Sequence, residues 1–368
     1  MIKKVLVANR GEIALRIFRT CRVMNLNTVA IYTHVDRGSL HVRYAEEAYC
    51  ISDDPDDTSY LKPEKILAIA KKTGAAIHPG YGFLSENADF ARQCEKEGVL
   101  FIGPNADIIE SMGIKTQARK TMKEAGLPIV PGIEAPLSSV EEAHQVAEEI
   151  GYPIMLKALA GGGGKGMRLV RSSDELAEAL RMSKSEALHA FGNDAVYMEK
   201  YIENPHHIEV QILGDRYGNI VHLGERECSI QRRNQKLIEE SPSPFLKQEV
   251  REKMLAMAVE AAKKIGYYSA GTLEFMVDKE QNFYFLEMNT RLQVEHPVTE
   301  LCTGVDIVRD MISVAGGNAL PYKQSDIKIQ GSAIECRIYA EDPANNFMPS
   351  PGIIKVREVP EGRNIRLD

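Results

Sequence analysis

The chain has 368 residues, 44% of them hydrophobic and 26% charged, and this length predicts two or three domains. Its formal net charge of −7 argues against a nucleic-acid-binding protein, and the sequence offers no apolar run near the ~20 residues of a membrane span. Six scattered cysteines without a Cys-x-x-Cys pair indicate reduced thiols, so we expect a cytoplasmic protein that binds neither nucleic acid nor membrane.

The first hundred or so residues alternate between strand and helix patterns. Strands are expected at 4–8, 28–33, 75–78 and 99–103, and helices at 12–24, 63–72 and 85–97, the last capped by Ser85. Such alternation predicts a parallel sheet with helices on both faces and ligands beyond the carboxyl ends of its strands. The loop 78–86 there places glycines on both sides of Tyr81. They suggest close approach to a ligand, although a tight turn with a half-buried aromatic ring is the simpler interpretation of this loop alone.

A second unit follows a proline-rich linker at residues 127–136. Strands are expected at 152–159, which contains Lys157, and at 167–170. The segment between them holds Gly161, Gly162, Gly163, Gly164 and Lys165. Bare glycine amides can wrap phosphate oxygens, and the two lysines add positive charge. The segment is not a P-loop, because Gly166 stands where Ser or Thr is required. A flexible surface hairpin is the alternative.

Two further segments suggest nucleotide or anion binding. Residues 199–202, which include Glu199, Lys200 and Ile202, predict a short hinge whose free backbone groups suit an adenine edge. His207 begins an alternating strand over 207–212. Residues 231–236, from Gln231 through Asn234 to Lys236, combine three cations with amides. This cluster either binds anions or forms a solvated edge strand.

The segment 287–297 is the most informative. Its polar side chains fall on every second residue: Glu287, Asn289, Arg291, Gln293 and Glu295. Because side chains of a strand alternate between faces, one face would carry them all, which suits a metal and an anion better than a core. Residues 270–278 and 283–289 predict a hairpin that pairs Asp278 with Phe283 and places Glu274 opposite Glu287.

Like charges in such a cross-strand pair destabilise it. A divalent cation removes that penalty, and a few hard oxygen ligands suit Mg²⁺ or Mn²⁺ on substrate phosphates; a solvated hairpin is the alternative. Eight extended residues span about 26 Å, so Glu287 and Glu295 cannot serve one small site on a straight strand. We therefore expect a bend near Thr290. A last strand, 333–337, ends in Arg337.

Together these motifs resemble the ATP-grasp enzymes and, more narrowly, biotin carboxylase. The matching motifs lie at 8–14, 78–87, 161–166, 231–236, 287–297 and 335–337, in the family's order along the whole chain. The resemblance implies an ATP-grasp fold of the α/β and α+β classes. Its parts would be an N-terminal doubly wound (Rossmann-like) domain over 1–112, a linker and mobile glycine-rich lid over 113–202, a metal and nucleotide subdomain over 203–330, and the start of an incomplete C-terminal domain over 331–368.

The resemblance also assigns roles to residues. ATP would contact Lys115, Lys157, Gly161, Gly162, Gly163, Gly164, Lys165, Glu199, Lys200, Ile202, His207, Gln231 and Asn234. Mg²⁺ or Mn²⁺ would be held by Glu274, Glu287 and Asn289. Bicarbonate or biotin would contact Tyr81, Lys236, Arg291, Gln293, Val294, Glu295 and Arg337. The catalytic group would comprise Lys236, Arg291, Glu295 as the base that deprotonates bicarbonate, and Arg337 facing the ureido oxygen of biotin.

The implied reaction is ATP- and bicarbonate-dependent carboxylation of biotin on a carrier protein or domain, through carboxyphosphate, for a separate carboxyltransferase. The family suggests a homodimer, in which Arg16, Arg19 and Arg22 form either part of the interface or a solvated face. The sequence departs from the family pattern at Ile114 (usually Asp), at Asn234 (often His) and in ending at Asp368. Another ATP-grasp ligase and a nucleotide-binding module without turnover are the alternatives.

Overall fold

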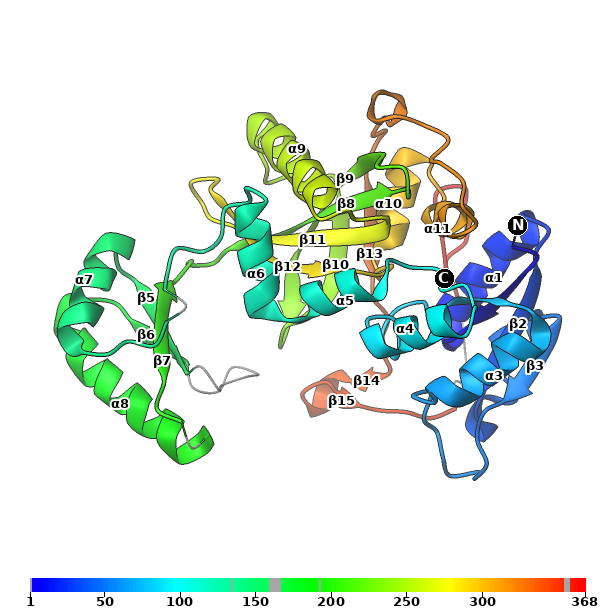
Figure 1. Cartoon of the computed structure of the whole chain (residues 1–368), viewed down its shortest axis with the longest axis horizontal. Coiled ribbons are helices and arrows are strands. Elements are labelled where there is room, and N and C mark those ends of the chain that lie inside the picture. The colour runs from blue at the N-terminus through cyan, green and yellow to red at the C-terminus, as the bar shows by residue number, and fades with distance from the viewer. Residues whose placement is uncertain (1, 134, 159–166, 192, 354–357) are drawn as a thin grey trace.

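The computed structural model describes residues 2–133, 135–158, 167–191, 193–353 and 358–368. Three units lie in a row in Figure 1: a sheet with helices near the termini, a larger central sheet, and a small sheet with two helices at the far end. Of the described helices, none has both the length and the hydrophobicity that crossing a bilayer requires.

The first unit is a parallel sheet of four strands in the order β3-β2-β1-β4. The strands are β1 (Lys4–Val7), β2 (Asn27–Tyr32), β3 (Glu47–Cys50) and β4 (Ala76–His78), and the helices are α1 (Gly11–Val23), α2 (Leu40–Tyr44), α3 (Pro63–Thr73) and α4 (Ala88–Lys96). Alternate residues of β1 enter different cores: Val5 packs with Ile17 of α1, and Leu6 packs with Ile66 of α3. The expected arrangement with helices on both faces is confirmed.

Two local expectations for this unit are wrong. Helix α4 begins at Ala88 and is capped by Asn87, whose Oδ1 accepts from Phe90 N at 2.8 Å; Ser85 instead lies in a turn, with its N–H on Gly82 O. The expected strand at 99–103 is reduced to a single bridge between Phe101 and Ile77. Ile102 still donates its N–H to Ile77 O, but Gly103 and Pro104 come next, and Pro has no N–H with which to extend the ladder.

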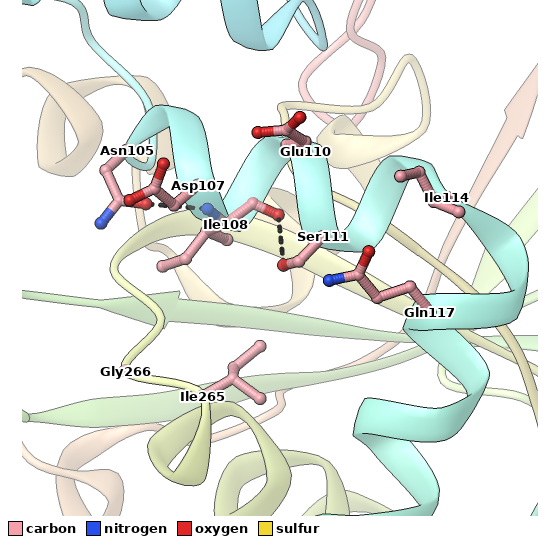
Figure 2. Close-up of a pocket in the computed structure, with 9 residues that line it drawn as sticks. All are labelled: Asn105, Asp107, Ile108, Glu110, Ser111, Ile114, Gln117, Ile265 and Gly266. Carbon is pink, nitrogen blue, oxygen red and sulfur yellow. Dashed lines mark hydrogen bonds between the residues drawn. The ribbon is translucent and has the colours of Figure 1, made fainter.

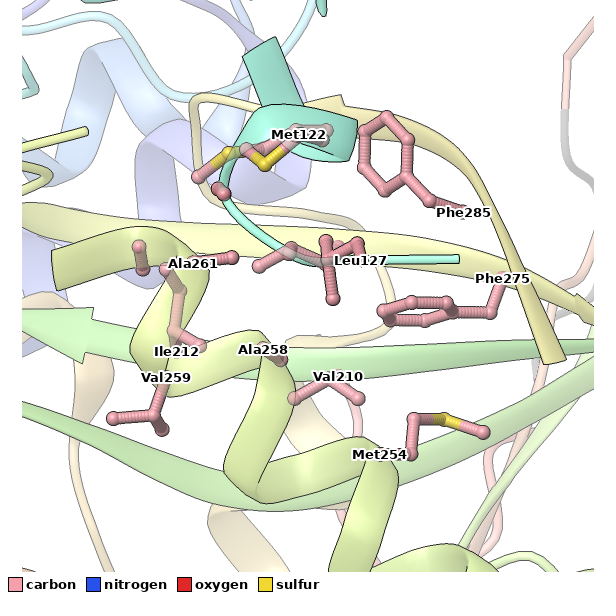
Figure 3. Close-up of a cluster of buried hydrophobic side chains, with 14 of the residues drawn as sticks. Met122, Leu127, Val210, Ile212, Met254, Ala258, Val259, Ala261, Phe275 and Phe285 are labelled. Atoms are coloured by element: carbon pink, nitrogen blue, oxygen red, sulfur yellow. The ribbon is translucent and has the colours of Figure 1, made fainter. Parts of the chain in front are cut away.

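The central sheet has the order β12-β11-β8-β9-β10-β13 with antiparallel neighbours. Its strands are β8 (His206–Gly214), β9 (Ile220–Arg232), β10 (Gln235–Ser241), β11 (Ser269–Val277), β12 (Phe283–Asn289) and β13 (Ala333–Cys336). One face packs against α5 (Ala106–Gly113), α6 (Lys115–Glu124) and α9 (Gln248–Lys264). Figure 3 shows this core, where Val210 and Phe275 of the sheet meet Met254 and Ala258 of α9.

Helices on the other side connect this sheet to the first unit. They are α10 (His296–Thr303) and α11 (Ile307–Ala315). Ile307 of α11 shares a core with Ala270 of β11 and with Ile13 of α1. The N-terminal unit is therefore packed onto the central sheet through α11, which fixes its loops relative to the polar end of β12.

The third unit is an antiparallel sheet in the order β6-β5-β7. It consists of β5 (Ile154–Ala158), β6 (Met167–Val170) and β7 (Val196–Lys200), with α7 (Val140–Ile150) and α8 (Ser173–Phe191). The expected linker is an extended segment that pairs with both neighbours, because Pro128 O accepts from Phe285 N and Pro131 O accepts from Lys200 N, each at 2.7 Å. Short elements near the end are η2 (Gln324–Asp326), β14 (Glu341–Asp342), η3 (Pro343–Asn345) and β15 (Met348–Pro349).

Candidate active site

The β11–β12 hairpin brings two acidic side chains together. Glu274 pairs with Glu287, as expected, but Phe283 pairs with Val277 and not with Asp278. A register shift between Glu274 and Phe275 separates the two ends of the ladder, and an extra residue on one strand is a β-bulge. The turn is thus one residue different from the prediction, and the bulge restores the predicted register at the acidic pair.

The polar segment bends where the prediction placed a bend. Strand β12 ends at Asn289, and residues 290–295 form an irregular turn before α10 begins at His296. Glu295 therefore swings away from the line of the strand. Its Oε1 lies 2.8 Å from Lys236 Nζ, and the same ammonium lies 3.0 Å from Glu274 Oε1. Lys236 joins the predicted metal carboxylate to the predicted base.

Glu209 was missed by the sequence reasoning. It is fully buried, pairs with Glu274 across β8 and β11, and contacts Lys236 Nζ. Its other oxygen lies 3.0 Å from Nη2 of the fully buried Arg226. The signal was present, because Glu209 alternates with His207 along β8, but its partners come from strands far away in sequence.

Arg226 links the buried polar side chains beneath the site by hydrogen bonds. Its guanidinium donates to Glu209, and also to Gln211 (2.7 Å), Thr272 (3.2 Å), Gln293 (2.7 Å) and Thr299 (3.1 Å). Gln293 in turn donates to Glu274 Oε1 at 2.8 Å. Because its side-chain amide is used inside the protein, any contact of Gln293 with an anion would come from its backbone.

The buried charges keep one another ionised. Burial alone would raise the pKa of Glu274, but His207 and Lys236 outweigh it and lower the pKa to about 2. Burial would likewise lower the pKa of His207, but the carboxylates of Glu209 and Glu274, 3.3 and 2.8 Å from its Nε2, raise it to about 9. For Lys236, the attraction of Glu209, Glu295 and Glu274 outweighs burial and raises the pKa. The site therefore holds fixed positive and negative charges at neutral pH.

Arg337 contacts the oxygen of Glu295 that Lys236 does not contact. It directly follows β13, and its Nη2 lies 3.0 Å from Glu295 Oε2. Its Nε donates to Glu239 Oε1 of β10 at 2.6 Å, a second contact that the sequence reasoning missed. The two oxygens of Glu295 thus face different cations.

Arg291 lies at the bend itself. Its Nε donates to Glu86 Oε2 at 2.7 Å, and its Nη2 donates to Asn289 Oδ1 at 2.8 Å. Glu86 comes from the loop that carries Tyr81. Tyr81 itself is half-buried and packs at the edge of a hydrophobic core, which agrees with the simpler interpretation of that loop.

The two predicted phosphate-binding lysines lie on different units, Lys115 at the start of α6 on the central sheet and Lys157 in the third unit. The Lys115 side chain is 82% exposed, and its Nζ lies 3.6 Å from Glu287 Oε2. Lys157 of β5 forms an ion pair with the buried Glu199, which Arg119 Nη1 also contacts at 3.2 Å. Gly161, Gly162, Gly163, Gly164 and Lys165 lie outside the described residues.

The hinge begins later than predicted. Glu199 and Lys200 belong to β7, where the backbone pairs with β5, and the chain leaves the strand at Tyr201, before the buried Ile202. At the other predicted cluster, the turn between β9 and β10 contains Asn234 with a φ of 64°. Gln231 donates to Cys228 O at 2.9 Å.

Two other features involve none of the predicted site residues except Arg16. A hollow of about 790 Å³ is lined by residues of α5, by Ile114 and Gln117 on either side of Lys115, and by Ile265 and Gly266 (Figure 2). Arg16 is buried and lies 2.9 Å from Glu300 and 3.0 Å from Asp306. The expectation that it belongs to an interface or a solvated face is wrong, since these carboxylates hold it inside the chain.

Comparison with known proteins gives this geometry a family. The chain is 57% identical to biotin carboxylase 1 of Bacillus subtilis over 100% of its own length and 82% of that protein. The chain belongs to the biotin carboxylase family. Residues 1–109 match the model "Biotin carboxylase, N-terminal domain", residues 115–323 match "Carbamoyl-phosphate synthase L chain, ATP binding domain", and residues 335–368 match "Biotin carboxylase C-terminal domain".

Solved biotin carboxylase structures show the same fold. The biotin carboxylase domain of a thermophilic 2-oxoglutarate carboxylase, bound to bicarbonate, superposes with a TM-score of 0.93 at 54% identity, over 98% of this chain and 80% of that one. A dimer of the Hydrogenobacter thermophilus domain with MgADP, ADP and bicarbonate gives 0.85 at 56% identity, with the same coverage. The expected ATP-grasp fold is confirmed.

Proposed function

We propose that this biotin carboxylase uses ATP and bicarbonate to carboxylate biotin. The observation that carries the proposal is the position of Lys236, whose Nζ lies 3.0 Å from Glu274 and 2.8 Å from Glu295. One ammonium group thereby contacts both Glu274, the proposed metal ligand, and Glu295, the proposed base. Family membership and the bicarbonate-bound relative support the same reaction.

The residues present fit a divalent cation. Glu274 and Glu287 face each other across the hairpin, and Asn289 lies beside them with its Nδ2 2.7 Å from Glu274 Oε1. Two carboxylates and an amide oxygen are donors that Mg²⁺ and Mn²⁺ accept. Bound there, the ion would offset the negative charge of the ATP phosphates.

The nucleotide would lie between the central sheet and the third unit. Lys115, which is exposed beside Glu287, and Lys157 would contact its phosphates, with Gly161–Gly164 and Lys165 covering them. The other proposed ATP contacts are Glu199, Lys200, Ile202, His207, Gln231 and Asn234.

We also propose that the domains of the chain meet after residues 112, 202 and 330.

In the first step, bicarbonate attacks the γ-phosphorus, an O–P bond forms and ADP leaves. Bicarbonate is a poor nucleophile, so Glu295 accepts its proton as it attacks. Arg291, Lys236 and the backbone at Gln293 and Val294 hold the anion. The product, carboxyphosphate, hydrolyses readily, and a closed lid excludes water from it.

In the second step, the C–O bond of carboxyphosphate breaks and yields CO₂ and phosphate. Phosphate takes the N1′ proton of biotin, and the nitrogen then attacks CO₂. Arg337 offsets the charge that develops on the ureido oxygen, with Glu239 and Glu295 fixing its guanidinium. Tyr81 would contact bicarbonate or biotin.

We also propose the partners, the oligomeric state and the cellular location of this protein. Biotin would arrive on a carrier protein or domain, and a carboxyltransferase would use the carboxylated product. The relative from Hydrogenobacter thermophilus is a dimer, which supports a homodimer here, and we propose a cytoplasmic location.

ADP release with MgATP and free biotin, measured with and without bicarbonate, tests the function. We expect release that requires bicarbonate and rises with biotin. Release at the same rate without bicarbonate would point to another ATP-grasp reaction. Binding of ATP without any release would make the chain a nucleotide-binding module.

A further inference from the structure

Glu86 extends from the N-terminal unit to the bend of the central sheet. Its Oε2 accepts from Arg291 Nε at 2.7 Å, and its Oε1 accepts from Thr290 N at 3.0 Å. One carboxylate therefore binds two successive residues at the point where the polar segment turns.

The loop that carries Glu86 is itself fixed. Asn9 Nδ2 donates to Pro79 O at 2.9 Å and to Tyr81 O at 2.7 Å. Gly80 has a φ of +67°, and a Cβ there would lie 2.9 Å from Asn9 Nδ2. Left-handed backbone favours glycine, so the close contact with Asn9 depends on this residue. The loop that carries Glu86 is thus held in place by its contacts with Asn9.

Three of the N–H donors of Arg291 already have protein acceptors. Its Nε binds Glu86, its Nη2 binds Asn289 Oδ1, and its Nη1 donates to Leu292 O at the longer distance of 3.3 Å. A guanidinium carries five N–H donors in a fixed plane, so one hydrogen on Nη1 and one on Nη2 remain for a ligand. Two such donors suit the two oxygens of a carboxylate-like anion.

Asn289 cannot be the lasting anchor of Arg291. Its Oδ1 is the oxygen proposed for the metal, and an ion there would compete with the Arg291 hydrogen bond. The contact with Glu86 is independent of the metal ligands. At 2.7 Å it is also charged and shorter than the 3.3 Å contact with Leu292 O, so it is the stronger of the two contacts that can hold the guanidinium plane while the site is loaded.

We infer that Glu86 is a positioning residue that orients Arg291 toward bicarbonate across the junction of the N-terminal unit and the central sheet. The inference rests on the proposed function, because it gives Arg291 an anion to bind. Glu86 then contributes to bicarbonate recognition without touching the anion.

Kinetics of Glu86→Gln test the inference. The amide keeps the size of the side chain, but it cannot accept from Thr290 and Arg291 with two oxygens. A hydrogen bond to a charged group contributes ~1.5–3 kcal/mol, so we expect the KM for bicarbonate to rise about 10-fold or more, with the KM for ATP within about twofold. Glu86→Asp should recover part of the loss.

Glu110→Gln is the matched control, because Glu110 of α5 forms an exposed ion pair with Arg92 of α4. It should leave both constants unchanged. In an Arg291→Ala background, Glu86→Gln should change kcat/KM for bicarbonate by less than about twofold. An equal loss in both backgrounds would overturn the inference, as would a Glu86→Gln enzyme with wild-type bicarbonate kinetics.

A spectroscopic readout separates this inference from the function itself. The ¹⁵N–¹H resonance of Arg291 Nε, assigned by its absence in Arg291→Lys, should be protected from solvent exchange in the wild-type protein. It should broaden in Glu86→Gln and persist in Glu110→Gln. Persistence in Glu86→Gln would overturn the inference even if no bicarbonate-dependent turnover were found.

Discussion

Charged residues of the proposed site occupy two different environments. Within the central sheet, Lys236 and Arg226 lie among buried carboxylates, and the Arg226 side chain has no exposure. At the start of α6, on the surface of the same unit, Lys115 has a side chain that is 82% exposed and lies 3.6 Å from Glu287. The buried cations are needed by their neighbours for folding, whereas the exposed Lys115 contributes little to folding and can serve the ligand.

The largest difference in stability between a buried and an exposed charge is expected at Arg226. Replacing it with Met would leave Glu209, Gln211 and Gln293 without their buried partner. Loss of one member of a buried ion pair costs ~3–5 kcal/mol, so the urea midpoint should fall strongly. Arg181→Met, which removes an exposed pair with Glu178, should change stability by less than about 0.5 kcal/mol. Equal midpoints for the two variants would contradict the comparison.

Lys236 and Lys115 should also differ, because only the buried lysine affects both activity and stability. Lys236→Met should lower kcat by ~100-fold or more and also lower the free energy of unfolding, because it leaves Glu209, Glu274 and Glu295 facing one another. Lys115→Met should weaken MgATP binding with an unchanged urea midpoint. Titration calorimetry and urea unfolding on both variants would measure this, and a stability loss at Lys115 would count against the distinction.

A smaller effect depends on pH. Burial, with repulsion from Glu239 and Glu295, raises the pKa of Glu335 to about 8. The unfolded carboxyl loses its proton near pH 4.5 and the folded one near pH 8, so the folded state holds more protons between these values. Stability should therefore fall as pH rises through this window.

The fall contributed by Glu335 should be roughly 2–3 kcal/mol between pH 6 and pH 8. Glu335→Gln should remove it, so the variant gains stability over the wild type as pH rises. The exposed Glu361→Gln serves as the control. Parallel stability curves for Glu335→Gln and the wild type would contradict this assignment.

The smallest effect is at the start of α6. Ile114 is the N-cap residue, is 49% exposed, and has an apolar side chain that cannot accept a hydrogen bond. Ile114→Asp should stabilise the protein by ~1 kcal/mol in urea unfolding. Ile114→Ala is the matched control and should give no gain, since it also cannot cap the helix.

Local patterns in the sequence predicted the hairpin, the Glu274–Glu287 pair and the bend near Thr290. The alternation of side chains along a strand and the length of an extended segment determine these features, and both can be worked out from neighbouring residues in the sequence. Glu209, Arg226 and Glu86 could not be found in this way, because their partners come from strand registers and loops far along the chain. The error at Ser85 has a local cause, since Asn87, two residues on, caps the helix.

The origin of the phosphate oxygen tests the account most directly. Bicarbonate labelled with ¹⁸O would be supplied with MgATP and biotin, and the released phosphate would be analysed by mass spectrometry. If bicarbonate attacks the γ-phosphorus and the C–O bond of carboxyphosphate then breaks, each phosphate should carry one oxygen from bicarbonate. Phosphate that takes its new oxygen from water alone would contradict the proposed role of the site around Lys236 and Glu295.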